Sequence, residues 1–159
     1  MSKDKKEVTL SKMNWLLFLL SRFKIPVIGF VKPKLLVLND TDVEVKIRLR
    51  RRSKNHLNSM YFGALAIGAD VAAGIHTFYF SEKLGLKVSF AFKGMNAEFL
   101  KRAESDIIFK CDQGEIIEKA ILKSDAEKVR INETVTVNAF DSNNEIVAKF
   151  DMIVSVKVK

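Results

Sequence analysis

Apolar and polar residues alternate without a break from Asp42 to Arg50. A period of two places the apolar side chains on one face, so this segment is predicted to be a strand that is buried on one side. Its apolar positions are Val43, Val45, Ile47 and Leu49. A shorter apolar run at 35–38 precedes it across the turn-forming pair Asn39 and Asp40, and this run predicts a second strand.

The segment from Met60 to about Phe80 is apolar on all sides, which is typical of a buried helix. Small residues recur along one line of this predicted helix, where a neighbouring layer can approach closely. They are Ala64, Gly68 and Ala72. Asp70 is the only charged side chain between Phe62 and Ile75.

The second half of the chain is mostly strand by the same alternation. The predicted strands cover 86–99, 105–112, 133–141 and 146–157. A bulge at Gly94 would explain the phase change inside the first of them. A helix is predicted at 115–127, and the turn at 141–144 makes the last two strands a hairpin. This order predicts an α+β fold in which an antiparallel sheet wraps around one long central helix.

The N-terminal segment carries more apolar surface than one solvated helix normally shows. Ser11 is the predicted N-cap, with Leu10 and Trp15 as a hydrophobic staple, and the helix should end near Lys24. Apolar residues lie on both of its sides, with Leu16, Leu19, Leu20 and Phe23 on one face and Leu17 and Phe18 on the other. We expect the body of the protein, a second subunit or a lipid surface to cover some of this area.

This segment is too short to be a transmembrane helix. Arg22, Lys24 and Pro26 interrupt it well before the ~20 apolar residues that a span needs. No small-residue cleavage site follows it, which argues against a secretory signal and favours a cytoplasmic protein. We therefore predict a helical extension over residues 1–30 and one domain over 31–159, with peripheral membrane contact by the N-terminal helix as an alternative.

The composition is that of one folded domain of 159 residues, with 48% apolar and 29% charged positions. The net charge of +8 would attract nucleic acid, a membrane surface or a small phosphorylated ligand. The cationic clusters at 50–54 and 101–102 do not interleave the aromatic residues of a single-strand-binding surface, so nucleic acid is the weaker prediction. No set of His, Cys and carboxylate residues has metal-ligand spacing, and Cys111 alone cannot form an internal disulfide.

The position of Asp70, a single carboxylate in an apolar segment predicted to be buried, requires an explanation. An isolated buried carboxylate costs several kcal/mol unless it is paired, hydrogen-bonded or protonated. Asp70 could be structural, bonded to a backbone amide or a basic neighbour at a subunit boundary or a solvent channel. It could also be functional, since catalytic carboxylates are perturbed in the same way.

The segment 55–65, which leads into Asp70, resembles the signature of hotdog-fold thioesterases of the phenylacetyl-CoA type. In that family a polar loop leads to a His-Gly-Gly helix start, with an Asp or Glu nine residues after the His. Here Tyr61 stands at the His position, Asp70 at the acid position, and Asn55 six residues before Tyr61. The resemblance covers nearly the whole chain from Lys34. It is strongest to an uncharacterised branch of this acyl-CoA thioesterase superfamily, of the DUF4442 type.

The resemblance implies a hotdog fold and a site at a subunit interface. Asp70 would be the general base or the nucleophile, and the backbone N–H of Phe62 or Gly63 would polarise the thioester carbonyl. Asn55 would orient the carbonyl or the attacking water. Tyr61 and Phe62 replace His-Gly, and a phenylalanine in place of glycine would narrow the oxyanion site.

The remaining candidates are polar or cationic. His56, beside Asn55, is a secondary catalytic candidate, although a single loop histidine is more often structural. Arg52, Lys101 and Arg102 would attract the phosphates of coenzyme A, which enters as part of the substrate and not as a separate cofactor.

Two functions follow from the sequence. The first is hydrolysis of an acyl-CoA or acyl-carrier thioester by a self-associating protein, a dimer or a tetramer. The second is a non-catalytic module that binds acyl-CoA or lipid. Hotdog dehydratases form a third class, which the absence of a histidine at the helix start disfavours.

Overall fold

The structure, a computed structural model, describes residues 6–159. The helical elements are α1 (Leu10–Leu19), the π-helical turn η1 (Leu20–Lys24), α2 (Pro26–Val31), α3 (Phe62–Leu84) and α4 (Gly114–Glu127). The strands are β1 (Lys34–Leu38), β2 (Val43–Ile47), β3 (Val88–Phe99), β4 (Ile107–Cys111), β5 (Ile131–Phe140) and β6 (Ile146–Val158). The strands form one antiparallel sheet in the order β1-β2-β4-β5-β6-β3.

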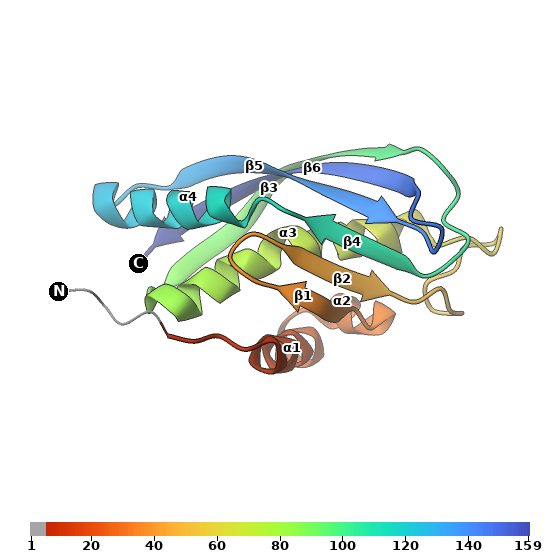
Figure 1. The fold of residues 1–159 in the computed structure, drawn as a ribbon, viewed down its shortest axis with the longest axis horizontal. Helices are drawn as coiled ribbons and strands as arrows, with labels where there is room; N and C mark the ends of the chain where they lie inside the picture. Colours follow the sequence, from red (N-terminus) through yellow and green to blue (C-terminus); the bar gives the residue numbers. More distant parts are fainter. Residues whose placement is uncertain (1–5) are drawn as a thin grey trace.

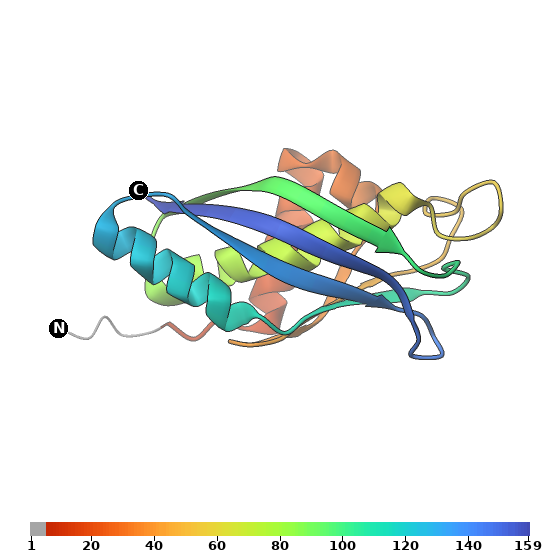
Figure 2. The ribbon, with the colours of Figure 1, turned by 90° about the horizontal axis from the view of Figure 1, so that it is seen from above.

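The sheet curls around α3, as the sequence pattern predicts (Figure 1). Helix α4 lies over the β5 and β6 side, whereas α1 and α2 lie on the opposite side of α3. Seen from above, β3, β5 and β6 cross over α3 as long twisted strands (Figure 2). Among the described helices, α3 alone is long and apolar enough to cross a membrane, and 67% of its apolar window is buried inside the protein.

A glycine lets the sheet approach the central helix. The ring of Phe109, on β4, lies so close to Gly68 that an added Cβ would meet the ring Cε2 atom at 2.2 Å. Ala64 and Ala72, on the same line of α3, are buried as well. The stripe of small residues is therefore the contact face between α3 and the strands.

The predicted strand irregularities are confirmed. The register of β3 against β6 shifts between Phe92 and Gly94, which is the expected bulge. The turn between β5 and β6 is held by Asp141, whose Oδ1 atom accepts hydrogen bonds from the Asn143 and Glu145 N–H groups, each at 2.9 Å.

Helix α3 begins two residues later than predicted. The backbone N–H of Met60 donates to Ala103 and that of Tyr61 donates to Ser53, both at 2.7 Å. These tertiary bonds hold the two residues outside the helix. The helix also runs past Phe80 to Leu84, where Gly85 ends it in a left-handed conformation (φ 63°).

The predicted N-cap of the first helix was wrong. Thr9 is the N-cap, and its Oγ1 accepts a hydrogen bond from the Lys12 N–H at 3.2 Å. The helix therefore starts two residues earlier than predicted; Met13 and Leu17 are buried, while Phe23 remains 71% exposed. Trp15 is not packed on the body as a staple, since it is 60% exposed and stacks on Phe18.

Candidate functional site

Asp70 lies on the side of α3 that faces the N-terminal helices. It is one wall of a slot of about 250 Å³, and it is the only charged side chain among the residues that line it. The other walls come from α1, η1, α2, α3 and β3: Leu17, Leu20, Ile25, Ile28, Val71, Gly74, Ile75, Phe78 and Phe90. The carboxylate therefore faces a mostly apolar cavity.

Burial raises the pKa of the Asp70 carboxyl from its ordinary 3.8 to about 6. Within residues 6–159, no hydrogen bond or ion pair holds this carboxylate. Within the described residues, Asp70 is therefore not a structural aspartate that is bonded to an amide or a basic neighbour. A carboxylate with a pKa near neutrality is suited to accepting a proton.

The start of α3 lines a separate and more open pocket of about 550 Å³. Phe62, which is 60% exposed, and Tyr61 lie on one side of it, and the segment 99–103 lies on the other. Tyr61 is the N-cap, and its side chain makes no capping hydrogen bond, so it does not occupy the first-turn N–H groups of α3. Its ring instead lies over Gly63, where an added Cβ would meet Tyr61 Cε1 at 2.3 Å.

Asn55 organises the loop before this helix. Its Oδ1 atom accepts hydrogen bonds from the N–H groups of Leu57 at 2.9 Å and Ser59 at 3.1 Å. Both Asn55 and the exposed His56 line the helix-start pocket. Four of the predicted catalytic residues thus line one pocket, namely Asn55, His56, Tyr61 and Phe62, whereas Gly63 lies next to it under the ring of Tyr61.

The predicted phosphate-binding cations do not converge. Lys101 and Arg102 line the helix-start pocket, but Lys101 pairs with Glu145, and Arg102 lies 3.6 Å from Glu104. Arg52 lies in a different cavity, where its guanidinium sits 5.4 Å from the ring centroid of Phe30.

That other cavity is strongly basic, and the sequence analysis missed it. It has a volume of about 570 Å³, and all of its charged residues are cationic: Lys32, Lys34, Lys46, Arg48, Arg50, Arg51 and Arg52. We call it the basic pocket. Lys46 lies on β2, and Arg48 and Arg50 continue the same alternation just beyond the end of the strand, so this pattern could have indicated the pocket.

Asp70 and the helix start line different pockets of one chain. Phe62 and Asp70 are about 12 Å apart along the axis of α3, given the rise of ~1.5 Å per residue. Phe90, from the first half of β3, lines the Asp70 slot, and Phe99, at the far end of the same strand, lines the helix-start pocket. Phe62 and Asp70 therefore do not share a cavity within one chain.

Other titratable groups have structural surroundings. His76 is fully buried, its Nε2 lies 3.0 Å from the Asn39 carbonyl oxygen, and burial lowers its pKa. Burial raises the pKa of the Cys111 thiol to about 11, so this cysteine is a buried strand residue as predicted. In the described part of the chain, no group of three His, Cys, Asp or Glu residues could hold a metal ion.

The sequence of this chain matches a known protein family. Residues 13–156 match the family described as Domain of unknown function, DUF4442. No sequence among the curated proteins matches this chain.

Several solved structures share the fold. A thioesterase candidate from Shewanella oneidensis has a TM-score of 0.79 at 14% identity, covering 92% of this chain and 99% of its own. A thioesterase from Haemophilus influenzae has a TM-score of 0.68 at 14% identity, covering 97% and 94%. Zebrafish thioesterase superfamily member 2 has a TM-score of 0.66 at 16% identity, covering 96% and 99%. The chain therefore belongs to the DUF4442 family and shares the hotdog fold of these solved structures.

Proposed function

We propose that this protein hydrolyses an acyl thioester, with Asp70 as the general base or the nucleophile. The observation that carries the proposal is the free carboxylate of Asp70 on an apolar slot, with its pKa raised to about 6. An amide-locked or ion-paired aspartate without a cavity would have argued against it. The thioesterase names of the structural neighbours support the same reaction.

As a base, Asp70 would take a proton from water while the water oxygen attacks the thioester carbonyl. The carbon–sulfur bond then breaks, and the thiol leaves with a proton. As a nucleophile, the Asp70 carboxylate would attack the carbonyl carbon and expel the thiolate, and water would then hydrolyse the resulting mixed anhydride to the free acid and the Asp70 carboxylate. In both routes negative charge develops on the carbonyl oxygen, and a first-turn N–H of α3, that of Phe62 or Gly63, would stabilise it.

A second copy of the chain would bring the two halves together. Strand β3 is an edge of the sheet, and the side chains of Met95 and Phe99 along it are 44% and 51% exposed. Antiparallel pairing of β3 with its own copy would place the Phe90 end of one strand beside the Phe99 end of the other. Asp70 of one chain would then lie near the helix start of its partner.

The acyl group would occupy the apolar slot beside Asp70, and the thiol-bearing part of the substrate would lie in the helix-start pocket. Arg102 is the more available cation for the phosphates of coenzyme A, because its contact with Glu104 is long, at 3.6 Å, whereas Lys101 makes a close ion pair with Glu145. A reducing cytoplasm fits the single buried cysteine.

One observation favours a non-catalytic alternative. The ring of Tyr61 lies over Gly63 and would crowd a thioester carbonyl that approached the helix start. If this ring stays in place, the protein would bind an acyl ligand without turning it over.

The test is release of free thiol from acyl-CoA thioesters of several chain lengths. We expect turnover by the wild type and a loss of at least about 100-fold in kcat for Asp70→Asn. Asp112→Asn, at an exposed position after β4, is the matched control and should keep full activity. Binding of acyl-CoA with no thiol release by the wild type would establish the alternative.

A further inference from the structure

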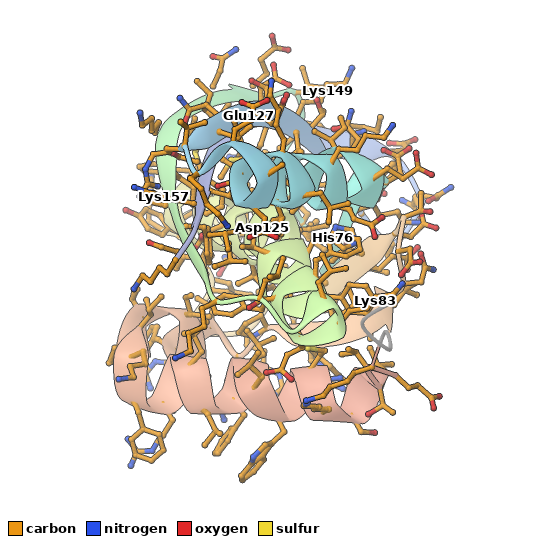
Figure 3. The ribbon with its side chains drawn as sticks, turned by 90° about the vertical axis from the view of Figure 1, so that its left-hand side faces the viewer. His76, Lys83, Asp125, Glu127, Lys149 and Lys157 are labelled. Carbon is orange, nitrogen blue, oxygen red and sulfur yellow. The ribbon has the colours of Figure 1, made fainter. Side chains whose placement is uncertain are left out.

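The N-terminal helices present large apolar side chains to the outside. Five of these side chains on α1, η1 and α2 are more than half exposed, and we call them the aromatic face: Trp15, Phe18, Phe23, Val27 and Phe30. Viewed from the end, the helical layer lies apart from α4, and ring side chains point away from the body (Figure 3). Soluble domains rarely leave so many large apolar residues together without a partner.

Cations surround this face. Arg22 and Lys24 are exposed on η1, between Phe18 and Val27. The basic pocket adjoins it directly, because Phe30 also lines that pocket and the Arg52 guanidinium stacks near its ring. Within residues 6–159, no ion pair with a carboxylate is found for Lys32, Arg51 or Arg52, so their charge is available to an outside partner.

We propose that the aromatic face and the basic pocket together dock onto an anionic phospholipid bilayer. The aromatic and aliphatic side chains would enter the boundary between headgroups and acyl chains, and the cations of the basic pocket would bind lipid phosphates. Membrane docking goes beyond the proposed hydrolysis, and the vesicle experiments test it independently of thioesterase activity.

Charge complementarity favours lipid over a second copy of this chain. A symmetric contact through the aromatic face would bring Arg22, Lys24 and Arg52 of both copies together, and like charges repel. A second copy of the chain has another surface to contact, the β3 edge with its exposed Met95 and Phe99. An anionic membrane would cover the exposed apolar side chains and also bind the cations beside them.

The location of the docking surface fits the slot beneath it. Leu17, Leu20 and Ile28, on the inner side of the same helices, line the Asp70 cavity. A bilayer against the outer side would therefore lie within one helix layer of that cavity.

Trp15 makes the proposal directly testable, because it is the single tryptophan of the chain and belongs to the aromatic face. The full chain is mixed with vesicles of phosphatidylcholine alone or of phosphatidylcholine and phosphatidylglycerol at about 3:1. We expect cosedimentation with the anionic vesicles, a blue shift of the Trp15 emission, quenching by brominated acyl chains, and release by high salt.

Two pairs of variants separate the contributions. Arg51→Glu with Arg52→Glu should weaken partitioning at least about tenfold, whereas Lys119→Glu with Lys123→Glu, an equal charge change on α4, should not. Phe23→Ser with Val27→Ser should reduce the Trp15 shift, and Leu122→Ser with Val129→Ser, exposed positions at the other side of the molecule, should leave it unchanged. Unchanged thermal melting checks that each variant folds.

Three results would overturn the proposal. The first is no association with anionic vesicles at low salt. The second is binding to free pyrophosphate with no vesicle association. The third is a Trp15 emission that is already blue-shifted without vesicles in a stable oligomer, because a second copy would then cover the aromatic face.

Discussion

Asp70 and Phe62 both lie on α3, about two turns apart, yet they line different cavities. Phe62 lies at the open mouth near the segment 99–103, and Asp70 lies in the slot below α1 and α2. This separation is the reason to propose a composite site, because a base and an oxyanion donor about 12 Å apart cannot act on one carbonyl.

A complementation experiment tests the composite site. Phe62→Pro removes one first-turn N–H at a position where proline is tolerated, and Tyr61 (φ −59°, ψ 137°) already has the backbone that precedes proline. Each of Phe62→Pro and Asp70→Asn should be inactive as a homodimer. Mixed and re-equilibrated in equal amounts, they should recover about a quarter of wild-type activity, because half of the dimers would contain one intact site.

Phe62→Ala is the control for that experiment, since it removes the ring and keeps the N–H. Activity of Phe62→Ala together with loss in Phe62→Pro assigns the effect to the backbone donor. Recovery that stays at the sum of the two separate variants would instead place a complete site in each chain.

The pH profile of turnover should report Asp70. A general base must be deprotonated, so kcat/KM should rise with pH through an apparent pKa of about 6 and level off above it. Asp70→Glu, which keeps a carboxyl, should retain a titrating profile if any activity survives. Because burial raises the pKa of Asp70 to about 6, the activity of an enzyme that uses it as the base must change between pH 5 and 8. A flat wild-type profile over this range would exclude Asp70 as the base.

Asp70→Asn should stabilise the protein at alkaline pH. The folded-state pKa of Asp70 lies above the unfolded value of 3.8, so its favourable contribution is complete below about pH 4 and is lost as pH rises through about 6. At pH 8 the buried charge is a cost, and removing it should raise the free energy of unfolding by about 1–2 kcal/mol. At pH 4 the two proteins should unfold at nearly the same denaturant concentration.

Asp106→Asn provides a control of opposite sign. Burial acts to raise the pKa of Asp106, but the hydrogen bond from the Leu49 N–H at 2.9 Å and the charges of Lys46 and Arg48 outweigh it and lower the pKa. This variant should therefore destabilise the protein at pH 8. An equal destabilisation by Asp70→Asn would mean that the Asp70 carboxylate is paired in solution.

Gly68→Ala should destabilise the fold by about 1–3 kcal/mol, although alanine is the better helix former. The added Cβ would overlap the ring of Phe109, which is itself fully buried and has little room to move. Chemical denaturation measures the loss. In the double variant with Phe109→Leu the penalty of the alanine should shrink, and strict additivity of the two changes would contradict a direct contact.

The order and type of the main helices and strands could be predicted from the sequence, because strands with one buried face and a helix with no polar face each leave a periodic pattern that is readable locally. The alternation at 43–49, the bulge at Gly94 and the isolated charge of Asp70 are all of this kind. The segment 55–65 also supplied the family resemblance, which the match over residues 13–156 confirms.

Which of these residues lie in contact or in one cavity could be seen only in the tertiary structure. The separation of Asp70 from Phe62, the pairing of Lys101 with Glu145, and the gathering of Lys32 with Arg52 depend on contacts between elements far apart in the chain. The same holds for α1, whose apolar residues surround it so completely that periodicity could not choose its buried side. That choice was made by packing, since Met13 and Leu17 fit against the core and Trp15 and Phe18 are left outside.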